Sequence, residues 1–417
     1  MVHLSDDAVA ISRRGLMKGA AMASLALPVA AAAKADGHGG TLRQQMVLAP
    51  DIRYFNAANI GPTFRAVTDA QQRETAAFQG DPSYEYRARY PELADRLRAR
   101  IGARLNVTAQ EIALVRNASE ANTVAVRGLA FKPGDQVIVT EHNHQSTLDT
   151  WRLRAEREGL ELVILPTPVT ARTVQEVTDG FAKAIGPRTR AIFLSHMTNV
   201  TGLVYPVAQI AALAKARGIW LHVDGAQSFG WMKLDLAGLG CDSFSGSTHK
   251  WLLGPLESGI LYVKRERQAA LHPLMLSHGY WLTDPANLDT AQKYEILGQR
   301  DDPKLDAIAQ TLDIVDGIGE QVIEARVQAL AADMRRALAQ TPGVRVVGSS
   351  DPALCGPVIT VALEGRDVAA VRRHLWQAGK VATAQAKAQG QALVRFSPHI
   401  YNSAEEIAAV ASLLAKA

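Results

Sequence analysis

The hydrophobic positions in the middle of the chain follow two different spacings. Short runs rich in β-branched residues are separated by segments in which apolar residues recur every three or four positions. The runs are "DQVIVT", "LELVILP", "TRAIFLSH" and "IWLHVD", and the segments between them are "STLDTWRLRAEREG", "VQEVTDGFAKAIG" and "VAQIAALAKARG". The first spacing predicts buried strands and the second predicts amphipathic helices. Strands that alternate with helices are parallel and joined by crossovers, so we predict an open α/β sheet.

The pattern differs on either side of this region. Before it, "PELADRLRARIGARLNV" predicts a helix from the spacing of Leu93, Leu97 and Ile101, and "NASEANTVAVRGLAFKPG" predicts a second helix that begins with a capping sequence. From Leu305 a long helical stretch precedes the strands "VRVVG" and "PVITVAL", the helix "RDVAAVRRHLWQAG", the strand "ALVRFS" and the helix "SAEEIAAVASLLAKA". We predict a large α/β domain over residues 54–304 and a smaller α+β domain over residues 305–417, with a ligand cleft between them.

The first residues carry a targeting pattern. "SRRGLMKGAAMASLALPVAAAAKA" contains Arg13 and Arg14, then a short apolar run made mostly of alanine. It resembles a twin-arginine export signal, and the run is too short and too rich in alanine for a stable membrane anchor. We predict a signal peptide over residues 1–33, cleaved near Ala33, and a mobile lead-in over residues 34–53. The mature protein is then periplasmic, after passage through the twin-arginine export machinery.

Composition excludes some classes of function. The net charge of +4 is small for 417 residues, and basic residues are interleaved with acidic ones, so we do not expect a nucleic-acid partner. Cys241 and Cys355 lack the spacing of metal ligands, and we predict no metal site. The two cysteines could form one disulfide, but we favour two small buried side chains.

Asp224 and Lys250 are the strongest candidates for chemistry. Asp224 closes the predicted strand "IWLHVD", and Lys250 follows another short strand, "DSFSGS". Ligands of α/β proteins bind at the carboxyl ends of strands. A lysine and a carboxylate in one crevice suit pyridoxal 5′-phosphate, because the lysine forms a Schiff base and the carboxylate keeps the pyridine nitrogen protonated. A structural salt bridge would explain the pair alone equally well.

The residues around this pair resemble a known family. "HVDGAQ" and "SGSTHK" are similar to motifs of the class V aminotransferase family of fold-type I pyridoxal phosphate enzymes, which includes cysteine desulfurases, isopenicillin N epimerases and kynureninases. The resemblance runs from about Tyr54 to the C-terminus. It implies Asp224 at the pyridine nitrogen, Gln227 near the phenolic oxygen, Lys250 as the Schiff-base lysine, and Ser247 and His249 at the phosphate.

Other motifs extend the resemblance. "NASEAN" resembles a phosphate-cradling helix start, which implies contacts from Ala118 and Ser119. "SHMTNVTG" implies that Asn199 lies near the ring, and "TEHNHQSTLDTW" implies a histidine stacked on the ring, for which the spacing selects His144 over His142. Taken singly, these residues could be a loop or core histidine or an ordinary helix cap.

Two further residues are implied to meet the substrate. "VRFSPHIYNS" resembles the stretch whose arginine binds the substrate carboxylate, here Arg395. "YFNAANIGPTFRAV" looks more like isopenicillin N epimerases than like desulfurases, which implies that Asn56 lines the substrate entrance. A surface ion pair or an ordinary turn would explain these residues when each is taken alone.

The sequence also departs from the family. Desulfurases use a mobile cysteine in the segment that is "GKVATAQAKAQGQALVR" here, and this segment contains none, so a persulfide route is not expected. Gln299, in "ILGQRDDP", stands where relatives often place a threonine that reaches the partner subunit's phosphate. The resemblance implies a homodimer.

These observations predict an enzyme that acts at the α-carbon of an amino acid or small peptide through Lys250. We favour an epimerase-like or aminotransferase-like reaction. One alternative is a lyase that eliminates a β-substituent, for instance by C–S cleavage, without a persulfide cysteine. Another is a periplasmic binding protein that kept the fold and lost catalysis.

Overall fold

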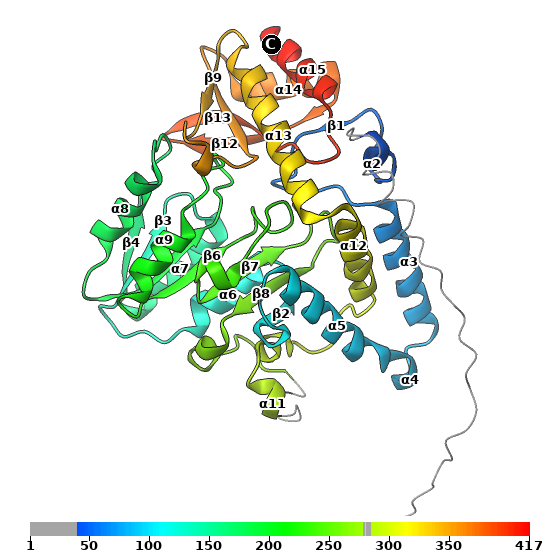
Figure 1. Cartoon of the computed structure of the whole chain (residues 1–417), viewed down its shortest axis with the longest axis vertical. Coiled ribbons are helices and arrows are strands. Elements are labelled where there is room, and N and C mark those ends of the chain that lie inside the picture. The colour runs from blue at the N-terminus through cyan, green and yellow to red at the C-terminus, as the bar shows by residue number, and fades with distance from the viewer. Residues whose placement is uncertain (1–39, 278–279, 281–284) are drawn as a thin grey trace, which may run out of the picture.

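The computed structural model describes residues 40–277, 280 and 285–417, and the predicted signal peptide lies outside the described residues. Figure 1 shows a larger α/β body with a smaller lobe at its top, where the C-terminus lies. No helix in the described part of the chain is long and apolar enough to cross a membrane.

Within the described residues, a seven-stranded sheet forms the centre of the body. Its order is β2-β8-β7-β6-β5-β3-β4, and β3 to β7 are parallel to their neighbours in this set, whereas β8 is antiparallel to both β7 and β2. The strands are β2 (Ile112–Val115), β3 (Gln136–Thr140), β4 (Glu161–Leu165), β5 (Thr189–Ser195), β6 (Trp220–Asp224), β7 (Ser243–Ser247) and β8 (Gly259–Val263). The predicted α/β sheet is confirmed.

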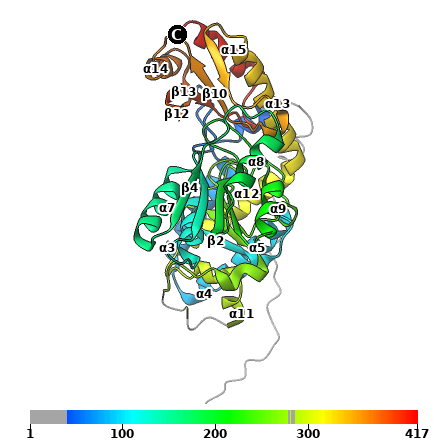
Figure 2. The same cartoon turned by 90° about the vertical axis from the view of Figure 1, so that its left-hand side faces the viewer.

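Helices cover both faces of this sheet. Figure 2 shows α7 and α9 on opposite sides of it. Alternate residues of β3 enter different cores, since Val137 and Val139 pack with α6 and α7, while Ile138 packs with α5, α8 and α9. Both faces are therefore apolar, as in parallel sheets generally. The covering helices are α5 (Arg89–Arg104), α6 (Ala118–Gly128), α7 (Gln145–Glu158), α8 (Val174–Ala184) and α9 (Val207–Lys215). Outside them, α3 (Arg65–Gly80) packs on α12 (Lys304–Ile318), which also packs on α5.

The smaller lobe is an α+β layer structure. Its antiparallel sheet has the order β12-β13-β10-β9 in the described residues. The strands are β9 (Val344–Val347), β10 (Ile359–Leu363), β12 (Ala384–Ala388) and β13 (Gln391–Phe396), and the helices are α13 (Glu320–Ala339), α14 (Val368–Gly379) and α15 (Ala404–Ala415). Shorter elements of the chain are α2 (Gly40–Gln44), α4 (Tyr84–Arg87), α10 (Leu236–Leu239), α11 (Pro285–Leu288), and the 3₁₀ turns Ala109–Glu111, Arg265–Ala270, Ala291–Glu295 and Pro352–Leu354.

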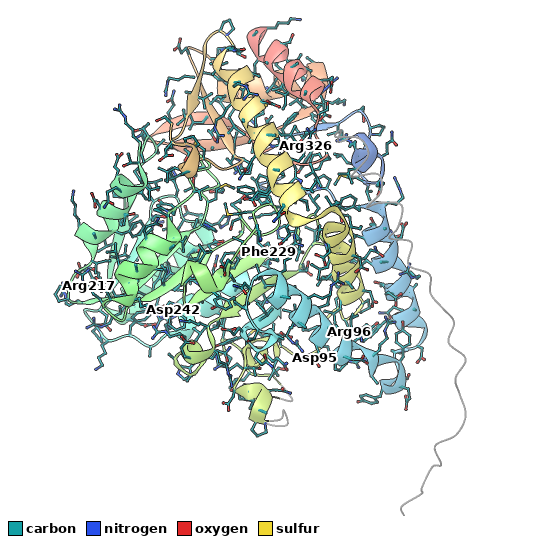
Figure 3. All side chains as sticks on the ribbon, viewed as in Figure 1. Asp95, Arg96, Arg217, Phe229, Asp242 and Arg326 are labelled. Atoms are coloured by element: carbon teal, nitrogen blue, oxygen red, sulfur yellow. The ribbon has the colours of Figure 1, made fainter. Side chains whose placement is uncertain are left out.

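The division between the two parts differs from the predicted one. The long helical stretch is broken at Gly319, whose φ of 94° favours glycine, and its first half, α12, packs on α3 and α5 of the body. The second half, α13, runs from the body into the lobe, where Arg326 donates a hydrogen bond to Asn402 O (Figure 3). At the other end of the chain, β1 (Arg53–Tyr54) pairs with β11 (Val381–Ala382) of the lobe. The lobe therefore contains both an N-terminal strand and the C-terminal residues.

The predicted mobile lead-in is wrong from Leu42 onward. Leu42 and Met46 are 8% and 2% exposed and belong to the main core. Arg43 Nη2 donates to Ile52 O at 2.6 Å, which fastens the segment to the residues before β1. The segment looked polar, but two apolar residues four positions apart are enough to anchor one helical turn.

Candidate active site

The carboxyl ends of β6 and β7 open into a cavity of about 320 Å³. Asp224 ends β6, Ser247 ends β7, and Asp224 lies opposite Ser245 in the parallel register, so the residues that follow the two strands meet there. Every predicted cofactor residue except Gln299 is among the lining residues, which are Asn59, Ile60, Asn117, Ala118, Ser119, Asn122, His144, Ser195, Asn199, Asp224, Ala226, Gln227, Ser247, His249 and Lys250.

Lys250 is held by a turn from a distant part of the chain. Gly61 N donates to His249 O at 2.7 Å. A Cβ atom on Gly61 would lie 2.0 Å from Lys250 O, so only glycine allows this close approach. Burial lowers the pKa of Lys250, Arg395 lowers it further, and Asp224 opposes the shift. The amine is therefore more easily deprotonated than an exposed lysine.

Asp224 is built to be a hydrogen-bond acceptor. Its Oδ1 accepts from Ala226 N at 2.9 Å and its Oδ2 accepts from Asn122 Nδ2 at 2.8 Å. Both bonds suit an ionised carboxylate, and a carboxylate is the group that stabilises a protonated pyridine nitrogen.

The start of α6 offers donors for an anion. Asn117 caps the helix by accepting from Glu120 N, and Ala118 N donates to Ser247 Oγ at 2.9 Å. The Ser247 hydroxyl proton is then left for a ligand, and Ser119 lies in the first turn, at the edge of the cavity. Helix N-termini bind phosphate groups through such amides and hydroxyls.

His249 adds a donor at the same end of the cavity. Its Nδ1 is buried and has no hydrogen-bond partner in the described residues. Burial, with a smaller effect of Lys250, lowers the pKa of His249 to about 4, so its ring is neutral near pH 7. A neutral imidazole can donate one hydrogen bond, and a phosphate would satisfy this orphaned ring.

Gln227 has a fixed amide orientation. Its Oε1 accepts from Trp251 Nε1 at 2.8 Å, and its Nε2 donates to Ala58 O at 2.9 Å. An indole nitrogen only donates, so the amide cannot be reversed. One Nε2 hydrogen remains for an oxygen in the cavity, which fits the predicted contact with the phenolic oxygen of pyridoxal phosphate.

His144 lines the cavity, and His142 is not among the lining residues. The Nδ1 atom of His144 accepts from Ser146 N at 3.3 Å and caps α7, so the neutral ring carries its proton on Nε2. Burial lowers the pKa of His144, Lys250 lowers it further and Asp224 opposes. Stacking of this ring on a cofactor stays a prediction.

Arg395 and Asn56 are not among the lining residues, but Arg395 bonds both Asn56 and the lining residue Asn199. Its Nη1 donates to Asn199 O at 2.8 Å and its Nη2 donates to Asn56 Oδ1 at 3.1 Å. The side chain is buried, its Nε has no partner in the described residues, and burial and then Arg372 lower the pKa of Arg395 to about 10. A buried cation with an unused donor is suited to a carboxylate ligand.

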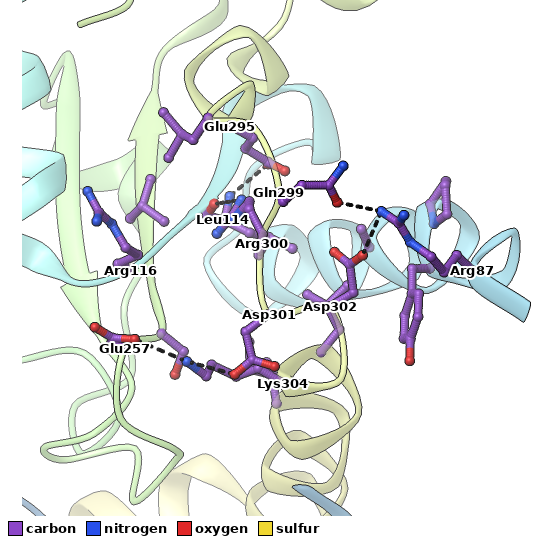
Figure 4. Close-up of a pocket in the computed structure, with 18 of the residues that line it drawn as sticks. Arg87, Leu114, Arg116, Glu257, Glu295, Gln299, Arg300, Asp301, Asp302 and Lys304 are labelled. Carbon is purple, nitrogen blue, oxygen red and sulfur yellow. Dashed lines mark hydrogen bonds and ion pairs between the residues drawn. The ribbon is translucent and has the colours of Figure 1, made fainter. Parts of the chain in front are cut away.

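Gln299 lies elsewhere. Its Oε1 accepts from Arg87 Nη2 at 2.7 Å in a separate cavity of about 600 Å³, shown in Figure 4. The structure therefore does not bring Gln299 to the cofactor residues of its own chain. A contact with the cofactor of a partner subunit stays a prediction.

Sequence reasoning missed several lining residues, of which Asn122 is the most informative. It lies one turn after Ser119 on α6, and it bonds Asp224 directly. Its signal in the sequence was a polar residue within an otherwise apolar helix face, "ANTVAV". Only the fold shows that this face meets β6 and β7.

No cysteine is among the residues that line the cavity. Cys241 and Cys355 are both free and neither lines the site, and burial raises the pKa of Cys241 to about 12. The segment where desulfurases carry their cysteine forms β11, β12 and β13 here. In the parts of the chain that the structure describes, no group of three or more histidine, cysteine, aspartate or glutamate residues could hold a metal ion.

The chain resembles characterised proteins over most of its length. The isopenicillin N epimerase of Streptomyces clavuligerus is 30% identical over 383 residues, which cover 89% of this chain and 96% of that protein. The isopenicillin N epimerase of Amycolatopsis lactamdurans is 29% identical with the same coverage. A probable cysteine desulfurase of Methanothermobacter thermautotrophicus is 27% identical and covers 88% of this chain and 94% of its own.

Solved structures share the fold. A mutant of C-DES with glycine covalently linked to its pyridoxal phosphate cofactor has a TM-score of 0.81 at 22% identity and covers 89% of this chain and 98% of its own. The cysteine desulfurase of Thermococcus onnurineus NA1 has a TM-score of 0.80 at 20% identity, with coverage of 90% and 97%. These neighbours confirm the predicted fold-type I architecture.

The model of one family matches nearly all of the described chain. This model, aminotransferase class V, matches residues 53–410. The match agrees with the anion-binding helix start, the acceptor carboxylate and the buried lysine that share one cavity. The chain therefore belongs to the class V aminotransferase family, and its cofactor is pyridoxal 5′-phosphate.

Proposed function

We propose that this enzyme acts at the α-carbon of an amino acid or small peptide and is epimerase-like or aminotransferase-like. One observation carries the proposal: Lys250 lines the cavity, and Arg395, which donates a hydrogen bond to the lining residue Asn199, lies close enough that its charge lowers the pKa of Lys250. One side chain is suited to proton transfer and the other is suited to holding a carboxylate. An α-amino acid needs both functions next to each other.

The cofactor residues have distinct roles in this proposal. Pyridoxal phosphate, when bound, supplies an electron-accepting ring that stabilises the charge left on the α-carbon. Ser119, Ser247 and His249 hold its phosphate, and Asp224 accepts from its ring nitrogen. Gln227 donates its remaining amide hydrogen to the phenolic oxygen. Each assignment uses a donor or acceptor that the protein leaves available.

Lys250 is the general base. A lysine with a lowered pKa is neutral in a larger fraction of molecules at pH 7, and a neutral amine can remove a proton. Arg395 orients the substrate by its carboxylate, while Asn56 and the Asn199 carbonyl hold the guanidinium in place.

The two reaction types differ in where the proton returns. An epimerase needs a second group that delivers a proton on the other side of the α-carbon. His144, whose neutral tautomer has its hydrogen on Nε2, is the candidate for that donor. The 30% identity to an isopenicillin N epimerase supports this branch. Transamination would not require this second donor, since Lys250 could return the proton that it removed, but it would require a 2-oxo acid to accept the amino group.

The test is proton exchange in D₂O. The purified protein with pyridoxal phosphate is incubated with L- and D-amino acids and short peptides, and products are analysed by ¹H NMR and chiral chromatography. Deuterium at the α-carbon with inversion indicates epimerisation, and transfer of the amino group to an added 2-oxo acid, with formation of the substrate's own 2-oxo acid, indicates transamination. Lys250→Ala should be inert. Release of a β-substituent as the main reaction would contradict the proposal and indicate a lyase. Absence of exchange with every substrate tested would contradict it in favour of a binding protein without catalysis.

Homodimerisation and export complete the proposal. Four of the exposed large apolar residues are Leu256, Leu274, Met275 and Leu276. The last three are consecutive and lie before Gln299 in the sequence. Their exposure supports an interface with a second copy, and light scattering would measure the mass of the assembly in solution.

Arg13 and Arg14 support export, so a change of both to lysine should keep the protein in the cytoplasm when fractions are compared by immunoblot.

A further inference from the structure

A buried line of polar side chains leads away from Asp224 into the interior of the body. Trp220 Nε1 donates to Ser243 Oγ at 3.0 Å, and Ser243 Oγ lies 2.8 Å from His222 Nδ1. His222 Nε2 lies 2.8 Å from Asn122 Oδ1, and Asn122 Nδ2 donates to Asp224 Oδ2 at 2.8 Å. These side chains are 0% to 6% exposed, so water does not compete for their bonds.

The bond to Asp224 sets the direction of the other bonds in the line, and the Trp220 end is compatible with it. At the far end, the indole nitrogen of Trp220 is a donor only, so Ser243 accepts from it and can donate its own hydrogen to His222 Nδ1. At the near end, an ionised Asp224 requires a donor, so Asn122 presents its NH₂ group to Asp224 and its carbonyl to His222. His222 must then carry its proton on Nε2. Ser243, with its hydrogen free after it accepts from Trp220, can then donate to the unprotonated Nδ1.

The rest of the surroundings agrees with this arrangement. Ser245 Oγ also donates to Asn122 Oδ1, at 2.6 Å, and the Asn122 carbonyl has a second lone pair for the His222 hydrogen. Burial lowers the pKa of His222 to about 4, against a smaller opposing effect of Asp224, so the ring stays neutral at pH 7. With the other tautomer of His222, the Asn122 amide would reverse and its carbonyl would face Asp224, and only a protonated Asp224 could donate a hydrogen bond to it.

We propose that Asn122 and His222 are positioning residues that orient the Asp224 carboxylate, by hydrogen bonds donated toward it, for the cofactor's ring nitrogen. The inference rests on the assignment of Asp224 in the proposed function. Each bond donates toward the carboxylate, and aligned hydrogen bonds in a dry interior polarise one another. Asn122 lines the cavity beside Asp224, whereas His222 acts only through Asn122.

The first test needs neither cofactor nor variant activity. In apoprotein labelled with ¹⁵N-histidine, His222 should be the Nε2–H tautomer from pH 6 to pH 8, with its signal assigned by its loss in His222→Gln. If His222 instead carries its proton on Nδ1 or is doubly protonated at pH 7, the inference is overturned. This measurement stands whether or not any substrate is ever found.

The second test reads the ring nitrogen of ¹⁵N-labelled pyridoxal phosphate in the holoenzyme. The wild type should show a protonated nitrogen, and Asn122→Leu and His222→Leu should both shift the signal toward the unprotonated form. His222→Gln should restore the wild-type signal, because its amide can donate to Asn122 Oδ1. Turnover should fall about tenfold in the two leucine variants, equivalent to about 1.4 kcal/mol, with little change in KM.

A matched control separates positioning from general loss of stability. Asn402 is also fully buried and bonded at both ends of its amide, to His399 N, Tyr54 O and Glu406, but it does not line the cavity. Asn402→Leu should lower the Tm and leave the ring signal unchanged. A protonated ring in all variants would sink the inference while leaving the proposed function intact, whereas failure to bind cofactor at all would count against the function.

Discussion

Arg395 Nη2 donates a hydrogen bond to Asn56 Oδ1, 3.1 Å away, and so joins β13 of the small lobe to the turn that leads into the large body. Nη1 is occupied by Asn199 O, and Nε faces no partner in the described residues. The guanidinium is therefore held through both Nη atoms, while its buried Nε keeps an unused donor.

Loss of the Asn56 amide should weaken substrate binding more than turnover. Asn56→Ala removes a hydrogen bond to a charged group, and such bonds contribute about 1.5–3 kcal/mol, so KM for a carboxylate substrate should rise roughly ten- to a hundredfold. Steady-state kinetics on the substrate found by the D₂O assay would measure this. Asn56→Asp should be worse, because its carboxylate would compete for Arg395. An unchanged KM in both variants would show that Arg395 does not bind the substrate.

A methyl group on Gly61 should displace Lys250. The added Cβ would lie 2.0 Å from Lys250 O and 2.7 Å from Leu253 Cδ2, so the turn and the lysine must move apart. Misplacement of a catalytic group by about 1 Å can cost about a hundredfold in rate. Gly61→Ala should therefore lose activity and the visible absorption of the lysine-bound cofactor.

The control for Gly61 is another glycine with free space around it. A Cβ on Gly80, at the end of α3, meets no atom within 4 Å. Gly80→Ala should keep both activity and absorption. If Gly61→Ala also keeps them, the turn does not position Lys250.

Acid should destabilise the protein through buried histidines. Burial lowers the pKa of His196 to about 4, while the unfolded chain has the ordinary value near 6.5. Below pH 6.5 the unfolded state binds a proton that the folded state does not, so the free energy of unfolding falls as pH falls toward 4. For one such histidine the loss between pH 7 and pH 5 is about 2 kcal/mol.

Urea unfolding of the apoprotein at the two pH values would measure this loss. His196 Nδ1 lies 3.0 Å from Ser228 Oγ, and an asparagine amide can take the place of that ring nitrogen. His196→Asn should therefore show a pH dependence smaller than that of the wild type by about 2 kcal/mol. Equal pH dependence in the two proteins would mean that His196 takes up its proton in the folded state as well.

Gln299 distinguishes a contact across subunits from a structural role. In the single chain it bonds only Arg87 among the described residues. If it reaches the partner's phosphate, Gln299→Ala should weaken binding of pyridoxal phosphate several-fold, by loss of about 1 kcal/mol, while the dimer remains intact. Fluorescence titration of the apoprotein and light scattering give the two quantities. Weaker dimerisation with unchanged affinity for the cofactor would assign Gln299 to the interface alone.

Most of the parallel strands were predictable because they are apolar runs that alternate with helices of clear periodicity. The antiparallel pair at one end of the sheet was not, since "IALV" of β2 and "GILYV" of β8 are short apolar runs without such a helix between them. The helix α3 was also missed, because only Val67 and Ala70 of its sixteen residues are buried, so its pattern is faint. Its partner is α12 rather than the sheet.

Site residues that belong to a local motif were predictable from the sequence. Contacts between residues that are distant in the sequence were not. Asp224, Lys250, Ser119 and Ser247 follow from local sequence, because a strand end and a helix start each bring their own geometry. The bond between Asn122 and Asp224 joins positions 102 residues apart, and nothing local to either residue indicates it. The same holds for Gly61, whose role depends on the distant turn at Lys250.

The pairing of β1 with β11 also bears on how the chain folds during synthesis. Arg53 Nη1 donates to Gly379 O, a contact that spans 326 residues. The first strand must therefore wait for nearly the whole chain to leave the ribosome before it finds its neighbour, and contacts of such long range form late. The large body can condense earlier, with its lysine already enclosed. The hydrogen bond between Arg395 and Asn56 forms only after β13 has been synthesised. A chain that terminates before β13 would therefore lack the proposed site for the substrate carboxylate, even if its large body folds.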